Sequence, residues 1–252
     1  MLIFWRVFAT ARKAQDIASL RNEVDVDSLY LDYAEPRSIA AAAEEVLNAT
    51  DGKLTALFNN GAYGQPGAVE DLKPDVLRAQ FEVAVFGWHD LTARVIPAMR
   101  ANGGGRLVFC SSVLGLVAAP YRGAYCASKF AIEALADALR LELKGAGIYV
   151  TLIEPGPIAS RFLEHALEAC RRNIDLEGSS HRYIYRARIA RLEAGGSKTF
   201  KLGPDAVAAK LARAVESRRP KPRYYVTIPT YAAVLFRRLL PTRALDAVAA
   251  SN

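Results

Sequence analysis

The chain has 252 residues, of which 52% are hydrophobic, and this length and composition suit one domain with a large continuous core. Lysine and arginine outnumber aspartate and glutamate by 33 to 26, which gives a formal net charge of +7. No basic motif interleaved with aromatic residues accompanies the charge, so we interpret the late arginines as solvated helix faces and expect no nucleic-acid partner. Binding to an anionic membrane surface stays open as a less favoured alternative.

The cysteines and the apolar runs bear on the cellular compartment. Cys110, Cys126 and Cys170 are odd in number and lack C-x-x-C spacing, which argues against both a disulfide framework and a zinc site. The three histidines show no metal-ligand spacing either, so we assign no metal. The apolar start at residues 1–5 is too short for a signal peptide or a membrane span. We expect a cytoplasmic protein with no transmembrane segment.

Short apolar runs alternate with longer stretches of helical periodicity, a pattern typical of a parallel sheet wrapped by helices. Runs rich in Val, Leu, Ile or Phe predict strands at residues 6–10, 28–31, 54–58, 106–111 and 148–153. Apolar spacings of three and four predict helices at residues 14–21, 36–47, 72–100 (with an interruption) and 125–144. The predicted fold class is therefore α/β, with a doubly wound parallel sheet.

After Pro155 the pattern loosens. An arginine-rich stretch covers residues 171–191, a glycine break follows, and we expect a helix near 205–217 and a strand near 224–228. The last segment, 231–250, alternates apolar clusters with arginines. We interpret it as a packed amphipathic tail, with a peripheral membrane contact as the alternative.

Three residues carry the chemistry that the sequence suggests. Ser112 stands at the end of a predicted strand, and Tyr125 and Lys129 follow at the start of a helix. A separation of four places the tyrosine and the lysine on one helix face, and ligands of open α/β sheets bind at the carboxyl ends of strands. A nearby ammonium favours the phenolate of a tyrosine, whose ordinary pKa of about 10 suits neutral pH poorly. We predict Tyr125 as acid and base, Lys129 as the group that lowers its pKa, and Ser112 as the group that orients a carbonyl oxygen.

These residues resemble the short-chain dehydrogenase/reductase family, over residues 6–162. Asn59-Asn60-Gly61-Ala62 resembles the family's Asn-Asn-Ala-Gly element with its last two residues exchanged, and Pro155-Gly156-Pro157-Ile158 resembles its Pro-Gly segment. Asp32 resembles the acidic residue at the adenine ring. The resemblance implies a Rossmann-like fold and a cofactor-binding set: Arg12, Asp32, Asn59, Gly61, Tyr125, Lys129, Pro155, Gly156 and Ile158.

The residues after the first predicted strand bear on cofactor choice. The family places there an acidic residue for the ribose of NAD or a basic one for the phosphate of NADP. This chain has Arg12 and Lys13 and no carboxylate, so we expect NADP(H) to be preferred over NAD(H). An exposed pair of cations at a helix start is the alternative interpretation.

The chain departs from the family pattern at two places. The family's opening strand, glycine-rich turn and helix are absent from the sequence, so we expect a sheet without its first strand and with two unpaired inner strand edges. Relatives also carry an Asn where this chain has Ala84, and that Asn supports a water in a proton relay to the lysine. We expect slower turnover. A misplaced or altered start, a sheet that closes differently, and a fragment without function all stay open.

The resemblance implies one domain over residues 1–252, with a cofactor and catalytic core at about 6–160 and a substrate-side and C-terminal segment at about 161–252. Apolar residues at 114–120 and at Phe162 and Leu163 predict a hydrophobic alcohol or ketone as substrate. The family also assembles into homodimers or homotetramers through helices that match residues 91–100 and 132–143, although packing alone explains their apolar residues. The alternative function is that of a truncated, catalytically weak or inactive relative that acts as a binding or partner protein.

Overall fold

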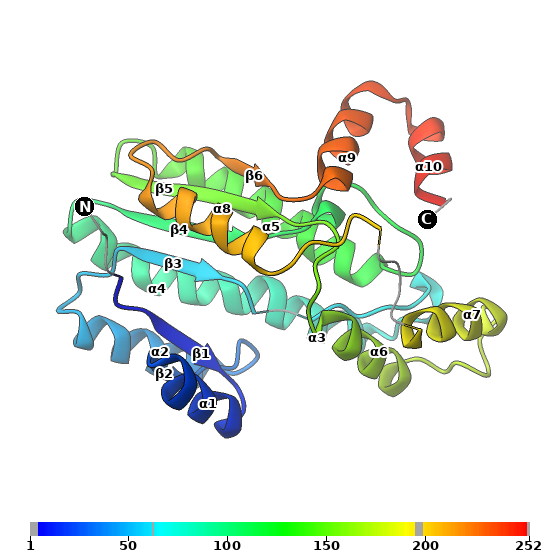
Figure 1. Cartoon of the computed structure of the whole chain (residues 1–252), viewed down its shortest axis with the longest axis horizontal. Helices are drawn as coiled ribbons and strands as arrows, with labels where there is room; N and C mark the ends of the chain where they lie inside the picture. The colour runs from blue at the N-terminus through cyan, green and yellow to red at the C-terminus, as the bar shows by residue number, and fades with distance from the viewer. Residues whose placement is uncertain (1–4, 62, 195–198, 251–252) are drawn as a thin grey trace.

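The computed structural model describes residues 5–61, 63–194 and 199–250, in which strands and helices alternate along the chain (Figure 1). The strands are β1 (Phe8–Ala11), β2 (Asp27–Tyr30), β3 (Ala56–Asn59), β4 (Gly105–Cys110), β5 (Ile148–Glu154) and β6 (Arg223–Tyr225). The α-helices are α1 (Ala14–Val24), α2 (Pro36–Ala49), α3 (Pro74–Phe81), α4 (Gly87–Ala101), α5 (Gly123–Glu142), α6 (Phe162–Asn173), α7 (Arg182–Glu193), α8 (Asp205–Glu216), α9 (Ile228–Leu239) and α10 (Thr242–Ala250). Each paired strand is parallel to its neighbour, so the predicted α/β class is confirmed.

The strands form two sheets. β1 pairs with β2, and a second sheet has the order β3-β4-β5-β6. Within the described residues β1 and β3 do not pair with each other, which agrees with the two open strand edges expected from the sequence. Figure 1 shows β1 and β2 beside the larger sheet, at the β3 edge.

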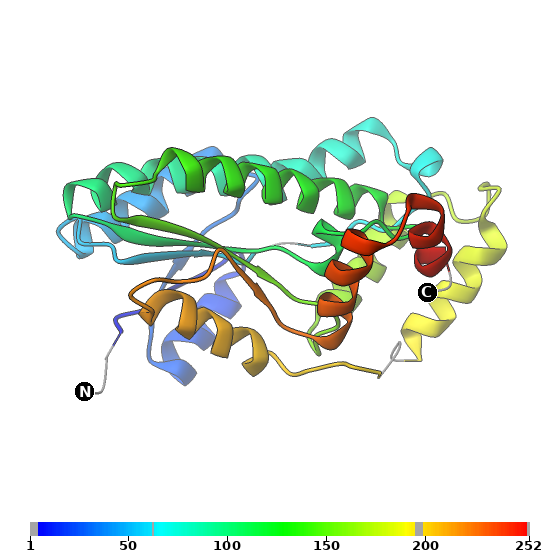
Figure 2. The same cartoon turned by 90° about the horizontal axis from the view of Figure 1, so that it is seen from above.

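Helices cover both faces of the larger sheet. Figure 2 shows α4 and α5 over one face and α8 over the other. Leu107 and Leu152 belong to the core cluster on the α5 side, whereas Val108 and Ile153 pack with residues of α8. Adjacent residues of β4 and β5 thus point to opposite buried faces, which explains why these strands are continuous apolar runs.

The smaller sheet is attached through α2, which packs on α4. Leu29, Ile39 and Leu91 come from β2, α2 and α4 and form one buried cluster. Tyr33, in the loop after β2, contacts this cluster and also the core of the larger sheet. The two sheets are therefore joined by side-chain packing, since β1 and β3 share no described backbone pairing.

The long helix predicted at residues 72–100 is interrupted as expected. α3 passes into a π-helical turn over Glu82–Phe86, and α4 continues from there. Ala84 lies inside this turn and is fully buried. Such turns often occur at functional sites, which is consistent with its place next to α5.

The C-terminal third differs most from the prediction. α6 and α7 were not predicted, and in α7 four arginines interrupt the apolar spacing. The late strand is shorter than predicted and ends at Tyr225, since α9 begins at Ile228 with Pro229 in its first turn. The tail is helical but is not packed as predicted: the apolar side chains of α9 form a largely exposed stripe of Ile228, Tyr231, Leu235 and Leu239.

Candidate active site

Most of the predicted site residues lie at the carboxyl ends of the parallel strands. Arg12 follows β1, Asp32 lies just beyond β2, Asn59 ends β3 and Pro155 directly follows β5. Ser112 comes two residues after β4 and caps a short 3-10 turn, where its Oγ accepts the Leu114 N–H at 3.1 Å. The edge of the sheet where ligands of such folds bind therefore holds this part of the predicted set.

Tyr125 and Lys129 lie one turn apart on α5, and both are buried. The Ser112 side chain hydrogen-bonds the Tyr125 phenol. The Lys129 ammonium donates to the Cys110 carbonyl at 2.7 Å, and it lies 4.4 Å from the Trp88 ring centroid and 5.6 Å from that of Tyr125. The structure thus brings Ser112, Tyr125 and Lys129 into one group, with the cation against two aromatic faces.

Burial dominates the electrostatics of this group. Burial raises the pKa of Tyr125 above its ordinary value, and the hydrogen bond from Ser112 offsets this only in part. Burial also lowers the pKa of Lys129 to about 8. Removal from water thus dominates the pKa of Tyr125, and the lowering of this pKa by Lys129 stays a prediction.

Phe162, the first residue of α6, packs against Tyr125. Its ring centroid is 5.4 Å from that of Tyr125, and the backbone of Gly64 lies against both rings. A Cβ at Gly64 would lie 2.6 Å from Phe162 Cζ and 3.4 Å from Tyr125 Cδ2, so glycine permits this close approach. Phe162 and Gly64 therefore pack together against the Tyr125 ring.

The Pro155–Ile158 segment is fixed by its neighbours. The Pro155 carbonyl accepts the Val113 N–H at 2.8 Å, which ties the end of β5 to the loop that carries Ser112. Gly156 lies against the hydroxyls of Thr227 and Thr230 at the start of α9. Ile158 forms a bridge with Leu202 and packs into the cluster beneath α8.

The two residues predicted at the adenosine end interact with each other. Arg12 Nη1 lies 3.8 Å from Asp32 Oδ2, and the Arg12 side chain is 63% exposed. Asp32 also accepts the Ala34 N–H at 2.9 Å. Arg12 is therefore held loosely, with its charge directed to the surface beside the end of β1.

Asn59 and Gly61 are engaged in packing. The Asn59 amide donates to the Thr92 hydroxyl at 3.0 Å, and its oxygen accepts from the Tyr33 hydroxyl at 3.4 Å. A Cβ at Gly61 would lie 2.8 Å from Tyr33 Cε2, so only glycine fits beneath that ring. These contacts support the junction of the two sheets, and Ala62 lies outside the described residues.

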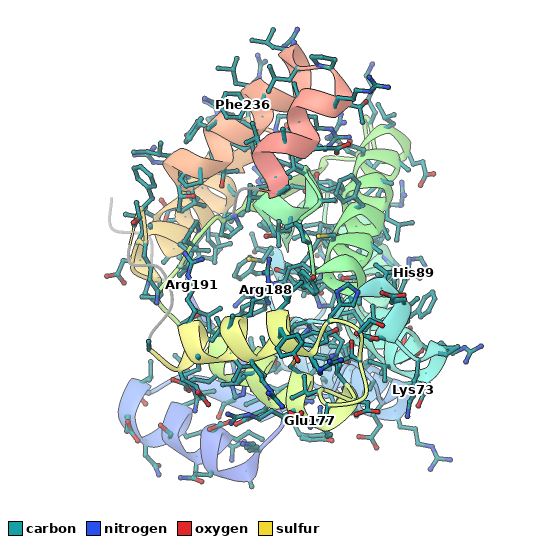
Figure 3. All side chains as sticks on the ribbon, turned by 90° about the vertical axis from the view of Figure 1, so that its right-hand side faces the viewer. Lys73, His89, Glu177, Arg188, Arg191 and Phe236 are labelled. Carbon is teal, nitrogen blue, oxygen red and sulfur yellow. The ribbon has the colours of Figure 1, made fainter. Side chains whose placement is uncertain are left out.

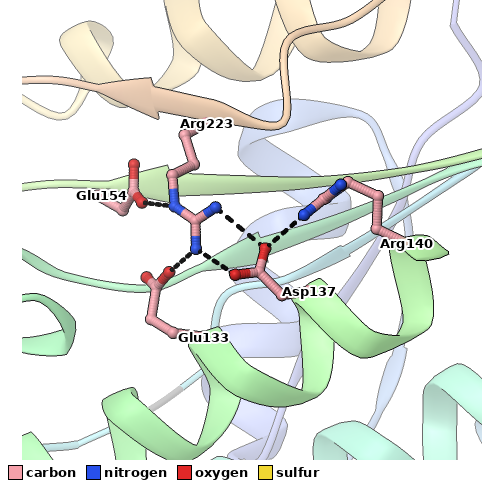
Figure 4. Close-up of polar contacts among 5 residues, drawn as sticks. All are labelled: Glu133, Asp137, Arg140, Glu154 and Arg223. Atoms are coloured by element: carbon pink, nitrogen blue, oxygen red, sulfur yellow. Dashed lines mark hydrogen bonds and ion pairs between the residues drawn. The ribbon is translucent and has the colours of Figure 1, made fainter.

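A buried charged cluster next to the site was not predicted (Figure 4). Arg223 Nη2 lies 2.9 Å from Glu133 Oε2 and 2.8 Å from Asp137 Oδ2, and Arg223 Nε lies 3.1 Å from Glu154 Oε1. Burial raises the pKa of Glu154 to about 9, with Glu133 adding to the effect. The sequence carried one signal for this cluster: Glu133 and Asp137 continue the spacing of four that begins at Tyr125.

Other binding features lie away from this edge or are absent from the described ranges. A hollow of about 700 Å³ between α8 and β6 includes none of the predicted site residues. Residues 5–61, 63–194 and 199–250 contain no group of three or more His, Cys, Asp or Glu side chains arranged to hold a metal ion. Nor does any helix in these ranges combine the length and apolarity needed to cross a membrane.

Known proteins resemble this chain in sequence and in fold. The family model of the short chain dehydrogenases matches residues 5–170. The "Uncharacterized oxidoreductase YbbO" of Escherichia coli K12 is 39% identical over 97% of this chain and 84% of that protein. The "NADPH-dependent 3-dehydrocapnine reductase" of Ornithobacterium rhinotracheale is 30% identical over 96% of this chain and 86% of that protein. The crystal structure of a short-chain dehydrogenase from Streptomyces avermitilis superimposes with a TM-score of 0.77 at 27% identity, covering 96% of this chain and 83% of that one. The chain therefore belongs to the short-chain dehydrogenase/reductase family of NAD(P)-dependent oxidoreductases.

Proposed function

We propose that this chain interconverts an alcohol and a carbonyl on a hydrophobic substrate with NADP(H), and that Tyr125, Lys129 and Ser112 carry the reaction. The observation behind the proposal is their grouping: the Ser112 hydroxyl bonds the Tyr125 phenol, and the Lys129 ammonium lies between the Tyr125 and Trp88 rings. The Arg12 guanidinium at the end of β1 supports the choice of NADP(H).

Each residue has a separate task in this proposal. In reduction the Tyr125 hydroxyl gives its proton to the carbonyl oxygen, and in oxidation the phenolate accepts the alcohol proton. Ser112 donates a hydrogen bond that holds the substrate oxygen in line with Tyr125. Lys129, with its pKa lowered to about 8, supplies positive charge beside the phenolate at neutral pH. NADP(H), when bound, supplies or accepts the hydride.

The residues present fit the two ends of such a cofactor. At one end Arg12 is exposed and bound only by a 3.8 Å ion pair to Asp32, so its guanidinium is free to take a phosphate. At the other end the Pro155 backbone is tied to the Ser112 loop, which sets a rigid wall beside Tyr125. The exposed, loosely held Arg12 is the side chain most suited to distinguish NADP from NAD.

An apolar substrate side agrees with the surroundings of Tyr125. The Phe162 ring packs against the Tyr125 ring. Leu163 follows Phe162 in the sequence, and the largely apolar residues 114–120 come shortly after Ser112. The contact of Phe162 with Tyr125 supports a substrate side in the segment after about residue 160 and a cofactor and catalytic core at about residues 6–160. Burial of the site by apolar side chains favours hydrophobic ketones over sugars.

The test is a titration of the chain with NADPH and NADH, followed by reduced-nicotinamide fluorescence, and then turnover with a panel of apolar ketones and small sugars. We expect NADPH to bind more tightly than NADH and only apolar ketones to be reduced. Arg12→Ala should weaken NADPH binding about 10- to 100-fold and change NADH binding little, because one charge-assisted contact is lost. Arg100→Ala, at another exposed arginine, is the matched control. Sugar turnover without ketone turnover would overturn the substrate class.

A second candidate function is that of a binding or partner protein with weak catalysis. Two observations favour it: Ala84 cannot hold a relay water by a side-chain hydrogen bond, and Phe162 covers Tyr125. A folded preparation that binds neither NADPH nor NADH would support this candidate over the enzyme.

A further inference from the structure

Two arginines near Tyr125 are half-buried without an acidic partner. Arg122 immediately precedes α5, and Arg188 lies in α7. Within the described ranges no carboxylate forms an ion pair with either one. Their neighbours behave differently: Arg171 pairs with Glu193, and Arg186 pairs with Glu177. Arg122 and Arg188 thus combine partial burial with the absence of an ion pair among the described residues.

The position of Arg188 is fixed by an aromatic group. Its guanidinium carbon lies 4.5 Å from the ring centroid of Tyr121, the residue before Arg122. The Tyr121 hydroxyl is 3.0 Å from His181 Nδ1, and its ring meets that of Tyr185 edge-on at 5.8 Å between centroids. Figure 3 looks onto this end of the molecule and shows Arg188 on the side of α7 that faces its centre, with Glu177 on the other side.

The backbone brings Arg122 to the same place. Tyr121 adopts a left-handed conformation with φ of 64°, which is unfavourable for a bulky residue. This turn lets Tyr121 stack beneath Arg188 while Arg122 starts the helix that carries Tyr125. Gly67 also forms a β-bridge with Arg122, which fixes the chain at this point. A conformation of this cost is retained where surrounding contacts hold it.

The partial burial of Arg122 and its nearness to Arg188 favour the binding of an anion. Burial and the nearby Arg188 both lower the pKa of Arg122, so its charge is held at a cost in free energy. Tyr125 is the first of the groups whose charge offsets this effect. The Arg122 guanidinium is therefore close enough to the Tyr125 phenol for an electrostatic interaction. It lies on the side of α5 that faces α6 and α7.

We propose that Arg122 and Arg188 bind an anionic group of the substrate, such as a carboxylate or a sulfonate, carried near the carbonyl that Tyr125 protonates. This inference rests on the proposed function and narrows its substrate class to amphipathic oxo acids, with an apolar chain against Phe162 and an anionic end between the two guanidinium groups. Arginine suits this task, since its planar donors match a carboxylate or sulfonate.

The experiment compares a γ-oxo fatty acid with its neutral methyl ester. With NADPH and the wild-type chain, we expect kcat/KM for the acid to exceed that for the ester by about 10- to 100-fold. This is the fold-change that corresponds to the free energy of charge-assisted hydrogen bonds. Arg122→Gln and Arg188→Gln should each remove most of this ratio, and Arg122→Lys should retain part of it. Arg186→Gln, on the same helix but paired with Glu177, should leave the ratio unchanged.

Calorimetric binding of the same two compounds in the presence of NADP separates this inference from the proposed function. Binding of the acid that requires Arg122 and Arg188 supports the inference even where turnover is absent, in which case only the proposed reaction fails. Equal binding or equal turnover of acid and ester by the wild-type chain overturns it. Equal losses for both compounds in the two variants also overturn it, since that is the result of a structural role.

Discussion

The two halves of α5 present ionisable side chains at the same spacing but in different surroundings. In the first half, Tyr125 and Lys129 are buried, and their hydrogen bonds go to Ser112 and to the Cys110 carbonyl. In the second half, Glu133 and Asp137 bind Arg223 from β6. The first half has no ion pair within the described residues, whereas the second is held by several.

The strands opposite each half account for the difference. The first half faces the end of β4, where the chain leaves the sheet and where Ser112 and the Cys110 carbonyl bond Tyr125 and Lys129. The second half faces β6, which places a cation where three carboxylates meet. A spacing of four along a helix thus places the side chains on one face. The neighbouring strand determines which partners they meet, and so whether they serve a reaction or stabilise the fold.

Replacement of the Tyr125 phenol should have the largest effect and should affect activity rather than stability, in contrast to changes in the second half of α5. We expect Tyr125→Phe to reduce kcat by about 10²- to 10⁴-fold, because the proton donor is lost, with little change in the melting temperature since the ring still packs on Phe162. Steady-state rates and thermal unfolding give the two values. Tyr149→Phe, at an exposed tyrosine of β5, serves as control. Retention of about wild-type activity would remove Tyr125 from the mechanism.

The opposite result is expected for the second half. Arg223→Met should lower the free energy of unfolding by about 3–5 kcal/mol, because it leaves the buried Glu133 and Glu154 carboxyl groups without their charged partner. Arg140→Gln removes only the more exposed pair to Asp137 and should cost less than about 1 kcal/mol. Urea unfolding measures both. Similar losses in the two variants would show that burial of the cluster contributes little.

The second half should also make stability depend on pH. Glu154 has a pKa raised to about 9, chiefly by burial, so the folded chain keeps a proton that the unfolded chain releases above its ordinary value. The stability associated with Glu154 is therefore complete at low pH and falls as pH rises toward 9, by up to roughly 1.4 kcal/mol per pH unit.

Glu154→Gln should flatten this dependence, since the amide does not titrate. Glu142→Gln, at an exposed residue of α5, should leave the dependence as it is. The measurement is the free energy of unfolding between about pH 5 and pH 9. Stability that rises with pH across this range in the wild-type chain would contradict the assignment.

The smallest effect is expected at the π-helical turn. Ala84→Asn should increase kcat by roughly a few-fold, because the amide can hold a water that passes protons to Lys129. Ala84→Ser, with a shorter polar side chain, tests whether the position tolerates a hydroxyl. Rates in H₂O and D₂O report the proton step. An unchanged rate for Ala84→Asn would show that turnover is not limited by this relay.

The sequence predicted the central part of the fold well because its signals are local. The runs at residues 106–111 and 148–153 match β4 and β5 within one residue at each end, since strands buried on both faces are apolar throughout. The Ser112, Tyr125 and Lys129 spacing also led to one group of side chains. In contrast, the pKa of Tyr125 depends on burial by Phe162, a residue 37 positions away in sequence whose contact no local pattern encodes.

The unpredicted features depend on contacts between distant segments. Arg223 meets Glu133 only because β6 pairs with β5, and the sequence around it reads as an ordinary basic turn. Asn59 was predicted at the cofactor, yet its side chain bonds Thr92 and Tyr33 in the junction between the sheets. A family motif therefore identified the position, while the packing determined what the side chain contacts.

The separation of β1 from β3 predicts two time scales for amide hydrogen exchange. β1 and β2 pair only with each other among the described strands, and α1 beside them has no buried residue. β4 and β5 have a partner on each side and helices on both faces. Amides of the small sheet should therefore exchange through local opening, long before those of β4 and β5, which require global unfolding. Such an opening would leave Ser112 and Tyr125 in place while it exposes the end of β1 that carries Arg12.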